Sequence, residues 1–305
     1  MVSIKTVAVL GGTGNLGPFI VQELLSAGFS VTGVTREAST NSTPKFPEGL
    51  DIKRVDYTSF DALKAAFEGQ DAVVSVVGGP GVPAQKIAVD AAVAAGVKRF
   101  IPSEFGINTR NVRGQPIAKI IGGKIAIVDY LQEVAKEHPE FSWTGLSTGL
   151  FFDWALERGT LSFNLKDKTA SIVDSGNEKW QASNLPQIGK SVAAILNHPD
   201  ETANKYLGTA SFNLSQNELI GVVEELTGVK LAIIHLKSED IQKAGEEKIA
   251  QGDFRAFLDF LRVHNFADGA GNALKAEESA NELIGLPYED LRETVKSWLE
   301  KAGVL

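Results

Sequence analysis

Short apolar runs alternate with longer amphipathic stretches through the first half of the chain. The runs predict β-strands at residues 7–10, 31–34, 51–55, 71–77, 99–102 and 141–146. The stretches between them repeat their apolar residues at helical spacing, which predicts helices at residues 19–27, 58–67, 83–95 and within 119–137. Strands that alternate with helices form a parallel sheet with right-handed crossovers. We therefore predict an α/β fold built on a doubly wound parallel sheet.

The second half of the chain has a different texture. Residues 151–188 show no sustained period apart from a β-like piece at residues 169–174, and the chain is mostly helical after Ser215. We predict a first domain at residues 1–150 and a smaller, mostly helical lobe at residues 151–305, interleaved with the first domain. Because ligands of doubly wound folds bind beyond the carboxyl ends of the strands, the lobe is expected to cover that edge of the sheet.

A glycine-rich turn joins the first strand to the first helix. Glycine tolerates the positive φ of a tight turn at Gly11, a side chain at Gly14 would collide with an approaching phosphate, and Gly17 allows close packing of the helix. The free N–H groups and the positive dipole end of the helix then face the phosphates. Strand, turn, helix and second strand follow in the order of a Rossmann-type dinucleotide site. The residues expected to contact the dinucleotide here are Gly11, Thr13, Gly14, Asn15, Leu16 and Gly17.

The residue at the end of the second strand selects between the two nicotinamide dinucleotides. NAD-specific domains usually have Asp or Glu at this position, which bonds the ribose 2′-hydroxyl. Here the residue is Arg36, whose guanidinium can pair with a 2′-phosphate and stack on adenine. Lys45, in the polar loop that follows, is a candidate second partner for the phosphate. The alternative is that both are solvated surface cations; we predict NADP(H) as the cofactor.

Composition narrows the functional classes. The chain has 305 residues, a net charge of −8 and no basic cluster, which argues against nucleic-acid binding. It has no cysteine, which excludes disulfides and thiol catalysis, and its four histidines are scattered, so no metal site is predicted. No apolar run reaches the ~20 residues that a membrane helix needs. A strand beginning soon after Met1 leaves no room for a signal peptide. We expect a cytoplasmic protein, either a monomer or a homodimer.

Lys124 is the main catalytic candidate. The helix that carries it is expected to begin near Gly122 and to pass beside the nicotinamide end of a bound dinucleotide. Partial burial and the helix dipole would lower the pKa of Lys124 toward the range useful for proton transfer. At that place Lys124 can bond the nicotinamide ribose, shuttle protons or do both, so it is also a candidate cofactor contact. The alternative is a surface lysine. Short-chain reductases often have tyrosine four positions earlier, but here that residue is Ile120, and Tyr130 lies on a different helix face.

Several segments together match one family. They are residues 11–17 (GGTGNLG), Arg36, residues 99–106 (RFIPSEFG), Lys124 with its helix, and residues 148–154 (TGLFFDW). In these features the chain resembles the isoflavone reductase-like and NmrA-like proteins, a branch of the atypical short-chain dehydrogenases/reductases. The resemblance runs along most of the chain and is strongest in its first half.

The resemblance implies an NADPH-dependent reductase of a small aromatic molecule, phenylpropanoid- or isoflavone-like, with Lys124 as the acid/base. It also implies an apolar substrate pocket, although core packing is the commoner role of any one aromatic residue. The residues implied to line the pocket are Phe105, Phe151, Phe152, Trp154 and Trp180. Gly78, Ser103 and Phe105 follow strands at the same sheet edge and are expected near the cofactor. Ser103 could bond the nicotinamide or a substrate oxygen, or simply hold the turn.

The loop at residues 107–123 departs from the plant members of the family, which have an acidic, proline-containing loop there. In this chain it carries Arg110, Arg113 and Lys119. If the loop covers the substrate, these cations favour a carboxylated or otherwise anionic acceptor. A solvated loop is the alternative explanation.

Two other functions compete with the reductase. An NmrA-like redox sensor would bind NADP(H) and regulate a protein partner without turnover, and such members often lack a competent acid/base group. Lys124 therefore argues against a sensor. A quinone reductase needs little proton chemistry and would tolerate loss of the lysine.

Overall fold

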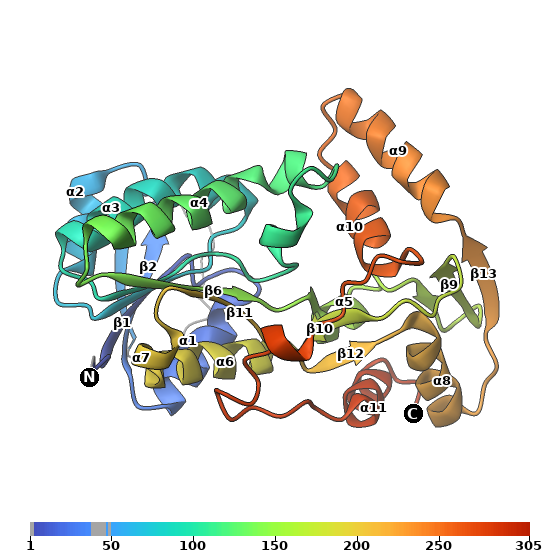
Figure 1. Ribbon diagram of the computed structural model, residues 1–305. Helices are drawn as coiled ribbons and strands as arrows, with labels where there is room; N and C mark the ends of the chain where they lie inside the picture. The colour runs from blue at the N-terminus through green and yellow to red at the C-terminus, as the bar shows by residue number, and fades with distance from the viewer. Residues whose placement is uncertain (1–2, 38–46, 48–49) are drawn as a thin grey trace.

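A seven-stranded parallel sheet with helices on both faces forms one side of the molecule, on the left in Figure 1. The computed structural model describes residues 3–37, 47 and 50–305. Along the sheet the strands are β11 (Lys205–Gly208), β6 (Ser142–Ser147), β5 (Arg99–Ile101), β4 (Ala72–Ser75), β1 (Thr6–Leu10), β2 (Ser30–Arg36) and β3 (Asp51–Val55). From β1 the chain adds β2 and β3 on one side and then β4, β5 and β6 on the other. The connections therefore change direction between β1 and β4, and the ligand crevice is expected there. The predicted Rossmann-type fold is confirmed.

Helices cover both faces of this sheet. On one face lie α1 (Gly17–Ser26), α6 (Leu185–Asn197) and the short α7 (Pro199–Thr202), and on the other α2 (Phe60–Phe67), α3 (Gln85–Ala94) and α4 (Ala118–Glu137) (Figure 1). Successive side chains of β1 point to opposite layers: Val7 and Val9 pack with α1 and α6, whereas Ala8 and Leu10 pack with α2 to α4. The sheet is therefore buried on both sides, as its continuous apolar strands require.

The expected start of α4 near Gly122 is wrong, since the helix begins at Ala118. A glycine inside a helix costs roughly 1 kcal/mol relative to alanine. Burial offsets this cost: Ile117 and Ile125 flank the glycines and belong to one buried cluster. Gly123 also permits a close approach, because an added Cβ would lie 2.9 Å from Cγ1 of Val82.

The C-terminal half contributes both to the main sheet and to a separate lobe. Helix α6 and strand β11 return to the main sheet, so residues 151–305 interleave with the first half. The lobe contains helices α5 (Phe152–Glu157), α8 (Gln216–Thr227), α9 (Ser238–Ala250), α10 (Ala256–Phe266) and α11 (Leu291–Lys301). In the part of the chain that the structure describes, no helix is long and apolar enough to cross a bilayer.

The lobe also holds two small sheets that the sequence only partly indicates. Their strands are β12 (Phe212–Leu214), β10 (Trp180–Ser183) and β7 (Leu150–Phe151) in one sheet, and β13 (Ala232–Leu236), β9 (Thr169–Val173) and β8 (Phe163–Asn164) in the other. Of these, β9 matches the predicted β-like piece. Strands of two to five residues are too short to show a period, which is why the lobe resembles a mostly helical region at sequence level. Three short 3₁₀ turns, Gly79–Ala84, Thr109–Val112 and Ala276–Glu278, complete the described elements.

Candidate functional site

The glycine turn after β1 has the geometry expected of a phosphate-binding turn. Gly11 has φ +84°, a conformation that favours glycine, and its N–H donates to the carbonyl of Val34 at 2.9 Å. At Gly17 an added Cβ would lie 2.1 Å from the carbonyl oxygen of Gly12, so only glycine lets α1 start against the turn. At Gly14 the nearest atom to an added Cβ is 3.8 Å away, which leaves room for a ligand.

The N-terminus of α1 is open toward this space. No side chain caps it, and Thr13, Gly14 and Asn15 are exposed or half-exposed. Leu16 differs from them, because its side chain is buried in the core and only its backbone faces the turn. The uncapped N–H groups and the open turn fit the pyrophosphate of a dinucleotide.

Arg36 lies at the end of β2, exposed and beside the same turn. The buried Tyr57 packs near this end of β2. Its hydroxyl donates to the carbonyl of Val34 at 2.7 Å, and burial raises its pKa to about 12. A neutral tyrosine beneath an exposed guanidinium leaves that guanidinium available to a 2′-phosphate. Lys45, the other predicted phosphate partner, lies outside the described residues.

Two predicted cofactor contacts follow β4 and β5 at the same edge of the sheet. Gly78 is exposed at the start of a 3₁₀ turn. The hydroxyl of Ser103 donates to the carbonyl of Val77 at 2.8 Å, and its N–H donates to Oε1 of Gln85 at 2.8 Å. Ser103 is 5 % exposed. These bonds favour the turn-holding role for Ser103 over a bond to the nicotinamide or substrate.

A cavity of about 600 Å³ lies beyond the ends of β5 and β6, between the main sheet and the lobe. Most of its wall is apolar. Its aromatic side chains are Phe105, Phe151, Trp154, Phe257 and Phe266. Its charged side chains, among the residues that the structure describes, are Glu104, Lys124 and Arg262. A cavity of this size and character accommodates a flat aromatic molecule of moderate size.

Two of the predicted pocket residues do not line this cavity. Phe152 and Trp180 are both fully buried, with ring centroids 6.1 Å apart. Phe152 packs edge-on against Phe212 at 5.0 Å, and Trp180 packs edge-on against Phe266 at 5.2 Å. The pocket role predicted for Phe152 and Trp180 is therefore wrong: they form the core of the lobe and stand behind Phe266, which does face the cavity.

Lys124 lies in the cavity wall, partly buried, with Glu104 as its charged neighbour. Burial lowers the pKa of Lys124, and the Glu104 carboxylate opposes that change. For Glu104 burial raises the pKa, and Lys124 opposes it. In the chain as described, the ammonium of Lys124 makes no hydrogen bond to protein. It is therefore free to bond a ligand in the cavity.

Glu104 is fixed by two hydroxyl groups. Its Oε2 accepts hydrogen bonds from Thr109 and, at 2.9 Å, from the hydroxyl of Tyr206. Its Oε1 is buried without a protein partner among the described residues. The pKa of Tyr206 is raised well above its usual value by burial and by Glu104, so Tyr206 stays a donor. The carboxylate is held by one oxygen while the other remains unengaged.

Sequence reasoning missed Tyr206 as a neighbour of the site. It lies on β11, far from Lys124 in sequence, so no local spacing connects the two. Ile120, at the usual tyrosine position, packs in an apolar cluster instead. Tyr130 bonds Asp90 and lies under Lys86, 4.2 Å from ring centroid to Nζ, on the far side of α4. Neither Ile120 nor Tyr130 can take part in proton transfer in the cavity.

None of the three cations at residues 107–123 lines the cavity. Arg110 stacks over the ring of Tyr206 at 4.3 Å, and Arg113 pairs with Asp129. Lys119 is exposed. The loop itself does contribute to the wall through Ile107 and Thr109, but the cation in the wall outside α4 is Arg262 of α10, which sequence reasoning did not single out. The available signal was the helical spacing of the apolar residues around Arg262, which predicts a helix that packs one apolar face against its neighbours.

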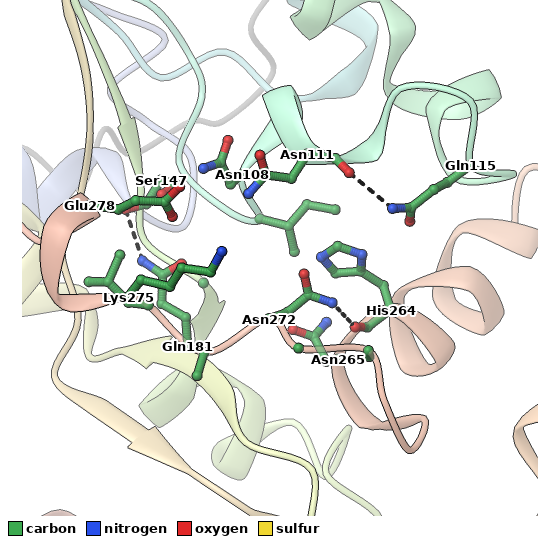
Figure 2. Close-up of a pocket in the computed structure, with 16 residues that line it drawn as sticks. Asn108, Asn111, Gln115, Ser147, Gln181, His264, Asn265, Asn272, Lys275 and Glu278 are labelled. Carbon is green, nitrogen blue, oxygen red and sulfur yellow. Dashed lines mark hydrogen bonds between the residues drawn. The ribbon is translucent and has the colours of Figure 1, made fainter.

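A second pocket, of about 190 Å³, lies beside the first and shares Ile107 and Gly149 with it. Figure 2 shows that its wall is rich in amides and is assembled from separate segments. The amide side chains are those of Asn108, Asn111, Gln115, Gln181, Asn265 and Asn272. His264 is buried there, and burial lowers its pKa to about 4, so its ring is neutral at pH 7. This polar wall does not suit an aromatic ring.

Comparisons with known proteins place the chain in a family. The sequence model of the NmrA-like family matches residues 3–268. Oxidoreductase poxI of Penicillium oxalicum is 35% identical over 293 residues, covering 94% of this chain and 92% of the relative. Isoflavone reductase homolog P3 of Arabidopsis thaliana is 29% identical, covering 79% and 81%. The structure of AtPrR2 with NADP+ and (+)pinoresinol has a TM-score of 0.81 at 26% identity, covering 98% of this chain and 99% of that one. The chain therefore belongs to the NmrA-like family, in agreement with its resemblance to the isoflavone reductase-like proteins.

Proposed function

We propose that this protein is an NADPH-dependent reductase of a small aromatic molecule and that Lys124 is its acid/base. The protein is an NADP(H)-dependent oxidoreductase: the open glycine turn and Arg36 fit the cofactor, the relative poxI is named an oxidoreductase, and the similar structure of AtPrR2 contains NADP+. The finer proposal, an aromatic substrate, is supported by the names of relatives such as isoflavone reductase homolog P3.

The observation that carries the proposal is a lysine without a hydrogen-bond partner in the described chain, set in the wall of an apolar cavity at the cofactor edge of the sheet. NADPH, when bound, supplies a hydride. Lys124 supplies the complementary proton or stabilises the oxyanion that forms on the substrate. Burial lowers the pKa of Lys124 and makes it a better acid, and the Glu104 carboxylate opposes that change. The apolar wall excludes water from the exchange.

The test is NADPH consumption by the wild type and by Lys124→Ala across aromatic acceptors: enones, phenylpropenyl alcohols and esters, imines and quinones. Loss of an acid/base group costs roughly 10²–10⁴-fold in rate, so turnover is expected to fall at least a hundredfold in Lys124→Ala. Lys119→Ala is the matched control, because Lys119 is exposed on the same helix. Its turnover should equal that of the wild type.

The other outcomes separate the competing functions. Equal turnover of quinones by the wild type and Lys124→Ala would remove the lysine from the mechanism and indicate quinone-type hydride transfer. No turnover by either, together with intact NADPH binding and different affinities for NADPH and NADP+, would favour the redox sensor.

A further inference from the structure

The charges in the cavity wall are unequal. Lys124 and Glu104 lie in the same wall with opposite charges, and each opposes the shift that burial causes in the pKa of the other. Arg262, on the α10 side of the wall, is the third charged group. Since the pair compensates itself, the charge of Arg262 is left over in a wall that is otherwise mostly apolar.

Arg262 has weak protein contacts for a partly buried cation. Its one hydrogen bond is a long one, 3.4 Å from Nη2 to the hydroxyl of Ser162. Over residues 3–37, 47 and 50–305 it forms no ion pair. Three other arginines near the cavity lie outside its wall and have partners: Arg110 stacks on Tyr206, Arg158 stacks over the ring of Trp154 at 5.8 Å, and Arg255, just before α10, pairs with Asp253. A guanidinium has five N–H donors, and most of those of Arg262 are therefore available to a ligand.

We propose that Arg262 binds an anionic group of the substrate, so that the acceptor reduced by this protein is an aromatic carboxylate. This inference rests on the proposed reductase function and specifies its substrate. A carboxylate carries one negative charge, which matches Arg262, the one uncompensated cation among the described residues of the wall, and its two oxygens match the planar fork of a guanidinium. A phosphate dianion would exceed the charge that the wall offers.

The arrangement gives the substrate two anchored ends. Arg262 comes from α10, in the lobe, and Lys124 from α4, over the main sheet. A carboxylate held by α10 leaves the reducible group of the same molecule to the α4 side, where the cofactor edge of the sheet lies. Phe257 and Leu261, on the same helix as Arg262, supply apolar contact between them. Arg262 is thus a specificity-determining residue and not an acid/base.

The test compares matched acceptors that differ only in charge. We would measure kcat and KM with NADPH for 4-carboxychalcone and 4-carboxycinnamaldehyde and for the methyl ester of each. Charge-assisted hydrogen bonds contribute enough that the wild type should prefer at least one acid over its ester by about tenfold or more in kcat/KM. In Arg262→Gln the KM of that acid should rise by about tenfold or more while the ester changes little, and Arg262→Lys should recover part of the loss.

Arg255→Gln is the matched control, because it removes one exposed positive charge just before the same helix and outside the cavity wall. It should leave the preference for the acid unchanged. Binding of the same four compounds to the NADP+-loaded protein, by calorimetry, keeps the two proposals apart. If neither these four compounds nor the wider panel of acceptors is reduced, the reductase proposal fails, yet tighter binding of an acid by the wild type than by Arg262→Gln would still support the anion site. Equal binding of acids and esters by the wild type would overturn it.

Discussion

Two cations, the buried Arg99 of β5 and the partly buried Lys124 of α4, lie near opposite ends of strand β5 and have different surroundings. Arg99 begins the strand, is 1 % exposed, and donates hydrogen bonds to four neutral oxygens. These are the hydroxyls of Ser142, Thr144 and Thr202 and the carbonyl of Pro199. Lys124 lies near the other end, beside Glu104, and makes no hydrogen bond to the described chain.

The difference separates a structural charge from a functional one. Burial lowers the pKa of Arg99 to about 10 and the charge of Asp200 opposes that change, while fixed oxygens accept the hydrogen bonds of the guanidinium, so it stays charged at pH 7 and rigid. Burial also lowers the pKa of Lys124, and no fixed acceptor holds its ammonium. An unsatisfied polar group costs stability and is retained where a ligand will use it. In this protein that position is the carboxyl edge of the sheet.

The largest expected contrast is in stability. Arg99→Met leaves several buried oxygens without donors, so it should lower the free energy of unfolding by about 3 kcal/mol. Lys124→Met should change it by less than about 1 kcal/mol, because Glu104 can take up a proton once the ammonium is gone. Urea unfolding at pH 7 measures both, with the exposed Lys119→Met as control. Similar losses of unfolding free energy in Arg99→Met and Lys124→Met would contradict the distinction between a structural and a functional cation.

A smaller effect is expected at a third cation, Arg36, which sits at the carboxyl end of β2 and is exposed. If it serves the cofactor, Arg36→Glu should weaken NADPH binding by about thirtyfold, through loss of the phosphate contact and added repulsion. NADH has no 2′-phosphate, so its binding should change little. Calorimetric titration with both dinucleotides measures this. Equal losses for NADPH and NADH would contradict the assignment of Arg36 to the 2′-phosphate.

The smallest expected effect is on the pKa of Lys124 when its neighbour Glu104 is changed. The Glu104 carboxylate raises the pKa of Lys124, so Glu104→Gln should let that pKa fall further. An acid works below its pKa, and the high-pH limb of kcat/KM should therefore move to lower pH, by about one unit. Tyr206→Phe, which removes a 2.9 Å bond but keeps the carboxylate charge, should move the limb less. If the high-pH limb does not move in Glu104→Gln, the Glu104 carboxylate does not set the pKa of Lys124.

Linkage gives the sign of the matching stability change. Because the pKa of Lys124 is lower in the folded protein than the usual 10.5, its favourable contribution is present above pH 10.5 and is lost as the pH falls through the folded value. In Glu104→Gln the pKa of Lys124 in the folded protein is lower, so the loss of this contribution extends to lower pH. Thermal unfolding of the wild type and Glu104→Gln over a series of pH values checks this direction independently of turnover.

The sequence by itself determined the parts of this protein that depend on neighbours along the chain. Strand alternation, the glycine turn and the arginine that ends β2 are local features, since backbone conformation and side-chain period act over a few residues. The segment at residues 148–154 was also recognisable, but its two phenylalanines were not separable. Phe151 ends β7 and lines the cavity, whereas Phe152 begins α5 and is fully buried.

Only the tertiary structure decided which distant groups meet. Glu104 follows β5, Lys124 lies on α4, Tyr206 on β11 and Arg262 on α10, and no spacing in the chain relates them. The parallel sheet brings the ends of β5 and β6 to one edge, and packing of the lobe against that edge supplies the rest of the wall. Charge pairing and burial depend on distance in space, so the balance between Lys124 and Glu104, and the unbalanced Arg262, emerge only once the chain has folded.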